Sequence, residues 1–273
     1  MSLWSIDSQD GIVVATYRNP PMNYFCAEGT QELVKLIESW REPSVRAVIL
    51  TGGIEGKFIT HYSVEELHEL ASRREEMRVL GTSLTAGYHA MLLALRDLPK
   101  PVIVAMNGDT MGGGFELSLS CDIRIGAKGD HRFGLPEVKL GILPGGSGTQ
   151  RLSRLIGAGR AIEFILRGRV VRPEEALALG LVHEVVDDVV GRAREIAAEI
   201  VASPPIAIAR AKQSVYSGSD THLKTGLEIE GAAFLETMLS DDAVRAMKTY
   251  VDLPFEKRRD WLEKPKHPRY EGK

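Results

Sequence analysis

Three short runs of apolar residues constrain the fold of this chain more than any other feature. They are VRAVILTGG (45–53), PVIVAMN (101–107) and DIRIGA (122–127). Runs that are short, rich in valine and isoleucine and bounded by turn residues are typical of strands buried on both faces of a sheet. Helical patterns separate them, which predicts β–α units joined by right-handed crossovers. We therefore expect an α/β protein with a largely parallel sheet.

The first hundred residues predict further elements around these strands. Residues 2–18 predict two short strands joined by a turn, and residues 30–40 predict a helix because their apolar side chains have helical spacing. Ser63 is expected to cap the next helix, with Glu66 completing a capping-box pattern. A helix at about 80–98 carries an apolar stripe that we interpret as core, made of Leu84, Tyr88, Met91, Leu92 and Leu95.

The second half of the chain is predicted to be mainly helical, with one short strand at 181–186. The expected helices are 148–156, 158–167, 173–180, 188–202, 205–217, 221–239 and 241–250. The last three have widely spaced apolar residues and many small ones, which suits packing between helices or subunits. A basic tail (256–273) is most simply a solvated end. We expect two regions, a core at 1–200 and a helical C-terminal region at 201–273.

Composition excludes several classes of protein. The 273 residues carry a formal net charge of −3, which gives no general attraction for nucleic acid. The two cysteines, Cys26 and Cys121, provide neither a disulfide framework nor metal-type spacing. The polar N-terminus lacks the apolar core of a signal sequence, and no apolar run approaches the ~20 residues of a membrane span. We therefore expect a cytoplasmic protein that uses no metal, membrane or nucleic acid.

The residues that suggest chemistry are concentrated at 107–151, in two glycine clusters and two glutamates. Glu116 follows the triple glycine 112–114, and Glu137 precedes the cluster 145–148. Glycines let a backbone approach a ligand closely, and a helix that begins there presents unpaired N–H groups to an anion such as a reacting oxyanion. A nearby carboxylate can then move a proton. The structural alternative is a strand-ending turn followed by a glutamate that merely favours the helix dipole.

Common catalytic and nucleotide motifs fail in this sequence. There is no P-loop, and Leu117 and Arg151 occupy the last glycine position of G-x-G-x-x-G at the two clusters. Thr149 replaces the final glycine of G-x-S-x-G, and no H-E-x-x-H zinc motif occurs. His61 lies in the irregular turn FITHYS (58–63), where the simplest interpretation is a hydrogen-bonded turn histidine.

The segment 107–157 resembles the enoyl-CoA hydratase/isomerase (crotonase) family. It reads NGDTMGGGFELSLSCDIRIGAKGDHRFGLPEVKLGILPGGSGTQRLSRLIG, and the likeness continues through LRGRVVRPEEALALGLVHEVV (166–186). Upstream, RNPPMN, RAVILTGG and KFITHYSVEEL match in order and spacing. The resemblance covers most of residues 1–250. It implies a crotonase-like ββα superhelix, followed by a helical C-terminal region that assembles homotrimers or hexamers (dimers of trimers).

The resemblance also implies roles for particular residues. The backbone N–H groups of Tyr62 and Gly113 would form an oxyanion hole for a thioester enolate. Glu116 would orient and deprotonate the water that attacks C3, and Glu137 would donate a proton to C2. The glycines at 145–148 would let the backbone approach that water. Because two neighbouring carboxylates cannot both ionise freely, one pKa should be raised.

The acyl-CoA substrate is the implied partner, and since coenzyme A is part of it, no separate cofactor is expected. The resemblance places six residues along this substrate: Met22, Thr60, His61, Gly112, Pro136 and Gly145. The turn departs from the family's F-[SA]-A-G-A-D-[LI], because His61 replaces a glycine and Tyr62 a small residue. These larger side chains should reshape the acyl or pantetheine entrance, and they leave open a role for His61. The tail lysines either contact CoA phosphates or are solvated.

Three functions compete at this point. The first is an enoyl-CoA hydratase of lipid metabolism that acts on a trans-2-enoyl thioester. The second is another reaction of the family, either double-bond isomerisation or, because of His61, hydrolysis of a carbon–carbon bond in a β-diketone-like substrate. The third is a non-catalytic oligomeric binding protein. The presence of both Glu116 and Glu137 argues against the third, because a binding protein needs neither.

Overall fold

The chain alternates strands and helices as far as Val186 and is mainly helical beyond it. The computed structural model describes residues 2–263 and 270–273. The strands are β1 (Trp4–Gln9), β2 (Ile12–Tyr17), β3 (Ala47–Gly52), β4 (Gly56–Lys57), β5 (Val102–Met106), β6 (Gly108–Met111), β7 (Ile123–Ala127), β8 (Phe133–Gly134), β9 (Val170–Val171) and β10 (Glu184–Val186). The helices are α1 (Ala27–Ser39), α2 (Val64–Ser72), α3 (Arg74–Leu80), the 3₁₀ helix η1 (Gly81–Thr85), α4 (Ala86–Arg96), α5 (Gly112–Ser118), the 3₁₀ helix η2 (Glu137–Leu140), α6 (Gly148–Ile156), α7 (Ala158–Leu166), α8 (Pro173–Ala178), α9 (Val189–Val201), α10 (Pro205–Ser219), α11 (Leu223–Met238), α12 (Asp241–Asp252) and α13 (Phe255–Leu262).

A six-stranded sheet of order β1-β2-β3-β5-β7-β10 forms the centre of the molecule. Only β1 and β2 pair antiparallel, and the other neighbours are parallel. The three apolar runs of the sequence form β3, β5 and β7, as predicted. In β3, Val48 and Leu50 enter one core cluster, whereas Ala47 and Ile49 enter the other. The expectation of strands buried on both faces in an α/β protein is therefore confirmed.

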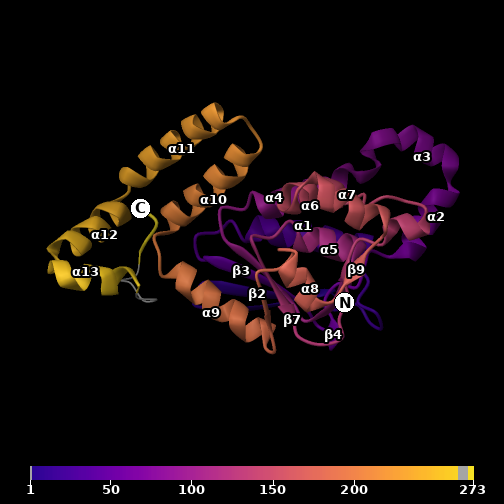
Figure 1. Ribbon diagram of the computed structural model, residues 1–273, viewed down its shortest axis with the longest axis horizontal. Coiled ribbons are helices and arrows are strands. Elements are labelled where there is room, and N and C mark those ends of the chain that lie inside the picture. The colour runs from indigo at the N-terminus through magenta and orange to yellow at the C-terminus, as the bar shows by residue number, and fades with distance from the viewer. Residues whose placement is uncertain (1, 264–269) are drawn as a thin grey trace.

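Helices cover both faces of this sheet (Figure 1). Helix α9 packs on β3, β5 and β7 and supplies Ala193 and Ala197 to the smaller core cluster. Helices α1 and α4 pack together over the opposite face, where Leu33 and Leu92 enter the larger cluster. The larger cluster also receives residues of α5, so it extends to the glycine-rich segment that carries the candidate site.

A second sheet of short strands, in the order β4-β6-β8-β9, holds the first glycine turn in place. Strand β6 leads directly into α5 at Gly112. A Cβ atom on Gly108, at the start of β6, would overlap the backbone of Gly56 in β4. This strand pair therefore requires glycine, and its close approach fixes where α5 begins.

The apolar stripe predicted for 80–98 is only partly core. Met91, Leu92 and Leu95 are buried in α4 as expected, but Leu84 is 38% exposed. The reason is that residues 81–85 form the 3₁₀ helix η1, whose three residues per turn do not continue the stripe of an α-helix. Tyr88 is half-buried, and it contacts the candidate site described below.

Half of the predicted capping box forms. The Glu66 N–H donates to Ser63 Oγ at 3.1 Å, as expected for a capped helix. The Glu66 carboxylate instead accepts the N–H of Ala27 at 3.0 Å, at the start of α1. The Ser63 N–H is already taken, because it donates to the Phe25 carbonyl at 2.7 Å. Glu66 therefore caps a different helix from the one predicted.

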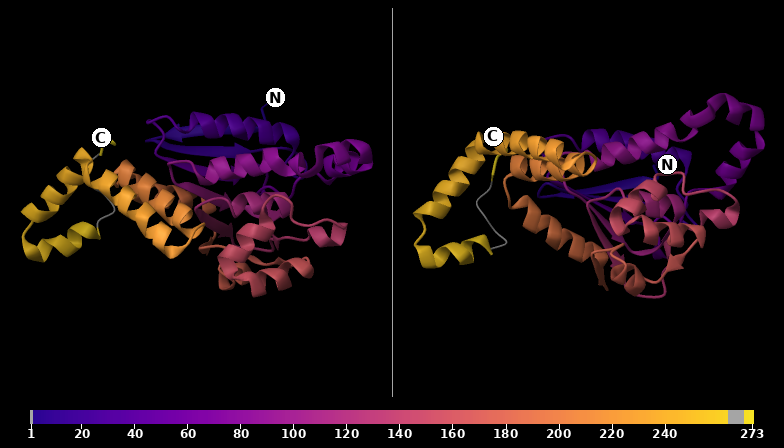
Figure 2. Two further views of the ribbon diagram at one scale, coloured as in Figure 1. Left: turned by 90° about the horizontal axis from the view of Figure 1, so that it is seen from above. Right: turned by 45° about the horizontal axis from the view of Figure 1, so that its top comes forward.

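The C-terminal helices extend away from the sheet. Helices α10 and α11 form an antiparallel hairpin, and α12 and α13 continue beyond it, at the opposite end of the molecule from α2 and α3 (Figure 1 and Figure 2). Helix α13 was not predicted. None of the helices in residues 2–263 and 270–273 is long and apolar enough to cross a bilayer.

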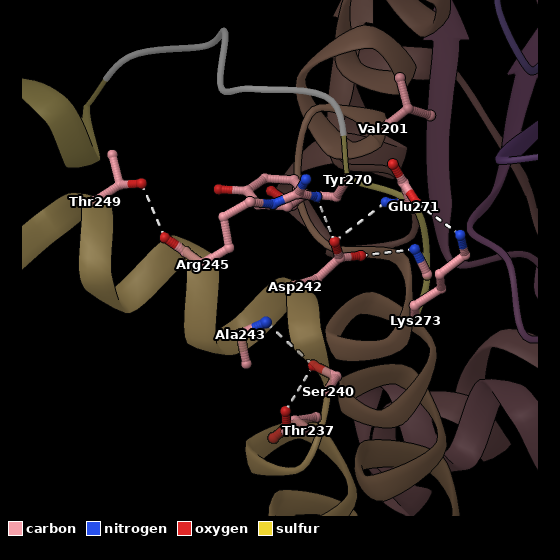
Figure 3. A network of polar contacts seen from close by, with 12 residues as sticks. Val201, Thr237, Ser240, Asp242, Ala243, Arg245, Thr249, Tyr270, Glu271 and Lys273 are labelled. Carbon is pink, nitrogen blue, oxygen red and sulfur yellow. Dashed lines mark hydrogen bonds and ion pairs between the residues drawn. The ribbon is translucent and has the colours of Figure 1, made fainter.

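The end of the tail is docked, in contrast to the expected solvated end. Asp242 is 1% exposed, and its carboxylate accepts the N–H groups of Glu271 at 3.1 Å and Gly272 at 2.6 Å (Figure 3). Arg245 pairs with the same carboxylate, and the Tyr270 side chain is buried. A buried acceptor with several donors is a strong anchor. The tail lysines at 264 and 266 lie outside the described residues.

We predict that Asp242→Ala releases this end of the chain. Two backbone N–H groups would lose their acceptor, and hydrogen exchange at Glu271 and Gly272 should accelerate by about 30-fold, the equivalent of ~2 kcal/mol. Amide exchange followed by mass spectrometry measures this. Asp241→Ala, at the exposed neighbouring position, is the control. Equal protection in the two variants would show that Asp242 does not anchor the tail.

Candidate active site

The first glycine turn and the 58–63 segment together present two backbone N–H groups. Gly113 lies in the first turn of α5, where N–H groups have no acceptor within the helix. Tyr62 and Phe25 form an isolated parallel β-bridge. The residues on either side of Tyr62 make the hydrogen bonds of this bridge: the Phe25 N–H donates to the His61 carbonyl, and the Ser63 N–H donates to the Phe25 carbonyl. The Tyr62 N–H therefore points away from Phe25, and its nitrogen lies 3.5 Å from where a Cβ on Gly113 would be. Two converging N–H groups of this kind suit an oxyanion.

Glycine is required here by close backbone packing. A Cβ on Gly114 would overlap the Ile59 carbonyl oxygen, and one on Gly113 would lie 2.9 Å from Tyr62 Cβ. Gly112 has φ of +49°, a conformation that side chains disfavour. The triple glycine thus lets the start of α5 lie directly against the turn that carries Tyr62.

Glu116 projects from α5 into the second glycine turn. It is 3% exposed, and its Oε1 accepts the Gly148 N–H at 2.7 Å. A Cβ on Gly146 would overlap Oε2, and one on Gly148 would lie 2.8 Å from Oε1. We expected these glycines to let backbone approach a water molecule, but the structure packs them around the carboxylate itself. Glu116 lies beyond the first turn of α5 and its carboxylate is buried, so it does not match the alternative of a glutamate that merely favours the helix dipole.

Glu137 begins the 3₁₀ helix η2 on the other side of the first glycine turn. It is 8% exposed, and neither of its carboxylate oxygens has a hydrogen-bond partner among the residues that the structure describes. Its Oε1 lies 3.2 Å from where a Cβ on Gly112 would be, which puts the carboxyl beside the two N–H groups. A buried polar group without a partner is costly, and at a site such a group is available to a ligand.

Burial raises the pKa of both carboxyls. Burial raises the pKa of Glu116 well above 4.5, and the charge of Glu137 raises it further, while the Gly148 N–H opposes the shift. Burial also raises the pKa of Glu137, to about 7. We expected one raised pKa, and both are raised. The deeper burial of Glu116 favours protonation of Glu116. The Gly148 N–H stabilises the Glu116 anion, however, whereas the Glu137 carboxylate has no such donor among the described residues. Donor geometry therefore favours the shared proton on Glu137.

The remaining predicted site residues lie around this centre. The His61 ring donates from Nδ1 to the Tyr62 carbonyl at 2.7 Å and stacks on Tyr24 at 4.1 Å, which matches a hydrogen-bonded turn histidine. The Thr60 hydroxyl is buried and donates to the Met22 carbonyl at 2.5 Å. This bond joins the 19–23 loop to the turn, so the Thr60 side chain serves the backbone.

Gly112, Pro136 and Gly145 occupy the turns beside the two glutamates. Pro136 immediately precedes Glu137, and His89 Nε2 donates to the Gly145 carbonyl at 2.7 Å.

Within the described parts of the chain, no group of three or more His, Cys, Asp or Glu residues could hold a metal ion.

Tyr88 is the site residue that sequence analysis assigned to the core. Its hydroxyl donates to the Gly113 carbonyl at 2.9 Å, and its ring lies against Gly146. A signal was present in the sequence, because Tyr88 is the only residue of the predicted stripe that carries a polar group.

Comparison with known proteins supports the resemblance noted in the sequence. Residues 7–264 match the family model "Enoyl-CoA hydratase/isomerase". The chain is 36% identical over 252 residues to a short-chain-enoyl-CoA hydratase of Clostridium acetobutylicum, covering 90% of this chain and 94% of that protein. It is 33% identical over 237 residues to the human mitochondrial methylglutaconyl-CoA hydratase, covering 85% of this chain and 64% of that protein. The crystal structure of an enoyl-CoA hydratase from Bacillus anthracis, 32% identical, superposes with a TM-score of 0.87 over 100% of both chains. The expected crotonase fold is confirmed.

We predict that Glu137→Gln stabilises the protein strongly at pH 8 and only slightly at pH 5. Below pH 4.5 the Glu137 carboxyl is protonated in both the folded and the unfolded chain, so its raised pKa costs no stability. Between pH 4.5 and about 7 it ionises in the unfolded chain but stays protonated in the folded protein, so the free energy of unfolding falls. Gln removes about 3 kcal/mol of penalty at pH 8, which should raise Tm by roughly 5 °C. Calorimetry at the two pH values measures the difference.

Glu184 provides the opposite control. Two hydrogen bonds donated by Arg192 lower the pKa of the Glu184 carboxyl. Ionised Glu184 therefore contributes to stability at pH values above the ordinary carboxyl pKa, and this contribution is lost in acid. Glu184→Gln should therefore slightly lower Tm at pH 8. If Glu137→Gln shifted Tm equally at pH 5 and pH 8, a raised pKa for Glu137 would be ruled out.

Proposed function

The chain belongs to the enoyl-CoA hydratase/isomerase family, and from that premise we propose that it is an enoyl-CoA hydratase, which adds water across the 2,3 double bond of an enoyl-CoA thioester. The observation that carries this proposal is the pair of buried carboxyls, Glu116 and Glu137, next to two convergent backbone N–H groups. The Clostridium acetobutylicum and human relatives, both named as hydratases of CoA thioesters, support it.

The proposed first step is binding of the thioester carbonyl oxygen by the N–H groups of Tyr62 and Gly113. Attack at C3 moves the electrons of the double bond toward this oxygen and makes an enolate. Fixed N–H donors at the start of a helix stabilise that developing charge without reorganising.

The glutamates then handle the protons. Glu116, as the anion supported by the Gly148 N–H, takes a proton from water while the water oxygen bonds to C3. The enolate collapses, and C2 takes the proton of Glu137. The product gains one hydroxyl at C3 and one hydrogen at C2. Return of the proton from Glu116 to Glu137 by way of solvent restores the starting state.

The substrate would lie along the turns that surround this centre. We assign Met22, Thr60, His61, Gly112, Pro136 and Gly145 to its acyl-CoA contacts. For Thr60 we assign the backbone rather than the side chain, since its hydroxyl is bonded to Met22. Coenzyme A is part of the substrate in this proposal.

The nearest alternative is double-bond isomerisation at the same oxyanion hole, which needs only one carboxylate. One relative, from Mycosarcoma maydis, is named an enoyl-CoA isomerase/hydratase. The two reactions differ in their dependence on Glu116. Hydrolysis of a β-diketone through His61 is less supported, because the ring is held by Tyr24 and the Tyr62 carbonyl.

We also propose that the chain assembles as a homotrimer or as a dimer of trimers through residues 201–273. No side chain of α11 is fully buried, and this helix and its end expose a series of large apolar residues: Leu223, Leu227, Phe234, Leu235, Met238 and Leu239. One face of α11 packs on α10, and the exposed apolar residues lie outside this contact. An apolar surface of this kind is typical of an interface with another protein chain. The family resemblance makes a further copy of this chain the expected cover.

We predict that the wild type hydrates crotonyl-CoA and that Glu116→Gln and Glu137→Gln each lose ~10²–10⁴-fold in kcat, because each removes one acid–base contribution. Loss of the ultraviolet absorption of the conjugated thioester measures the rate. Glu163→Gln, at an exposed ion pair, is the control. Full activity in Glu116→Gln would favour isomerase-like chemistry, and a wild type inert on every enoyl-CoA would refute the hydratase proposal.

We predict that sedimentation gives a trimer or hexamer for the wild type and smaller species for Phe234→Glu, since a charge buried in an apolar interface is costly. Val79→Glu, at an exposed apolar residue of α3 at the other end of the molecule, should leave the assembly unchanged. A monomeric wild type would contradict the assembly proposal.

A further inference from the structure

Tyr88 connects the two glycine turns that build the candidate site. It lies in the first turn of α4, and its hydroxyl donates to the Gly113 carbonyl at 2.9 Å. At the other turn, a Cβ on Gly146 would lie 2.5 Å from Tyr88 Cε1 and would overlap Glu116 Oε2. The phenol ring therefore spans from the oxyanion-hole helix to the backbone that holds Glu116.

Tyr88 is itself held by two other rings. Tyr62 meets it edge to face, with ring centroids 5.8 Å apart, and Phe25 lies at 6.2 Å from Tyr88 and 6.3 Å from Tyr62. Edge-to-face clusters of this kind fix ring orientation. We call Phe25, Tyr62 and Tyr88 the aromatic wall. Its members come from three separate segments, so each ring restrains the other two.

Burial and the charge of Glu116 raise the pKa of Tyr88, so the phenol stays neutral and remains a hydrogen-bond donor. Its bond to the Gly113 carbonyl restrains the first turn of α5, which also carries the Gly113 N–H. A neutral, restrained phenol next to the reacting groups can affect both the position of that N–H and the space beside Glu116.

We infer that the aromatic wall restricts the substrate to short-chain 2-enoyl thioesters and that Tyr88 is its specificity-determining residue. The inference rests on the proposed function, in which C3 of the enoyl group lies at Glu116. Carbons beyond C3 then extend toward the ring that lies against Gly146 and Glu116. A crotonyl group has one such carbon, whereas an octenoyl group has five, which the wall must exclude or bend.

Space for a longer chain begins at residues that adjoin the wall. A cavity of about 830 Å³ lies between α4, α6 and α10, and its lining includes Thr85, His89, Gly145 and Ser147. These residues flank Tyr88 in α4 and Gly146 in the second turn. Removing the phenol ring should therefore give a longer acyl chain a place to continue, in addition to relieving a clash.

The test is the chain-length profile of kcat/KM with trans-2-enoyl-CoA substrates of four, eight and twelve carbons. Wild type should fall by at least about tenfold from four to eight carbons, because misplaced methylenes cost that much in a closed pocket. Tyr88→Ala should raise the ratio of eight- to four-carbon activity by about tenfold. Tyr62→Ala, which thins the same wall, provides a second variant if Tyr88→Ala does not fold.

Tyr88→Phe separates positioning from steric exclusion. It keeps the ring and removes only the bond to Gly113, so the chain-length ratio should stay unchanged while kcat falls by about five- to tenfold with KM nearly constant. Tyr270→Leu is the matched control, because it removes a buried tyrosine at the docked end of the chain that belongs neither to the aromatic wall nor to the lining of the cavity. Its chain-length ratio should equal that of wild type.

The outcomes separate this inference from the proposed function. A wild type that hydrates four- and eight-carbon substrates equally would overturn the inference and leave the hydratase proposal intact. An unchanged ratio in folded Tyr88→Ala and Tyr62→Ala would also overturn it. A wild type that hydrates none of the three substrates would instead refute the function on which the inference rests.

Discussion

The candidate site depends on one close approach between two pieces of backbone. The start of α5 lies so near the 58–62 segment that a single methyl group on Gly114 would overlap the Ile59 carbonyl. This approach brings the Gly113 and Tyr62 N–H groups together, and it directs Glu116 away from them into the second glycine turn. Sheet pairing between β4, β6 and β8 holds the approaching strand in place. The geometry of the site therefore follows from backbone packing rather than from side-chain contacts alone.

Different hydrogen-bond partners distinguish the two carboxyls, although they are the same residue type and both are buried. Glu116 has a backbone donor and Glu137 has none within the described residues. Both pKa values are raised by loss of solvent, so neutral and ionised forms lie close in free energy near neutral pH. The proposed hydration, in which one carboxyl takes a proton and the other gives one, needs this balance. The burial that produces the balance costs the folded protein stability.

The sequence predicted the parts of the fold that depend on local pattern. The strands β3, β5 and β7 follow from their apolar runs. In the structure Tyr62 lies beside Gly113 and Glu137 beside Gly112, whereas Glu116 lies against Gly146 and Gly148. The failures involve contacts between distant segments. Asp242 binds residues 29 and 30 positions away, and Glu66 caps a helix 39 positions earlier in the chain. Tyr88 stays on the α4 stripe with Met91 and Leu92, but its hydroxyl bonds to the Gly113 carbonyl, 25 positions away. Neither periodicity nor spacing records such pairings.

The bond from Glu66 to the start of α1 has a consequence for the protruding helices α2 and α3 (Figure 2). The segment that leaves Tyr62 is fastened within one turn, by the Ser63 cap and by Glu66 on Ala27. These two hydrogen bonds separate the outer part of α2 and α3 from the N–H groups of Tyr62 and Gly113. Insertions or sequence drift beyond Leu67 can alter which surfaces these helices offer without disturbing the two N–H groups, so this region can evolve separately from the chemistry.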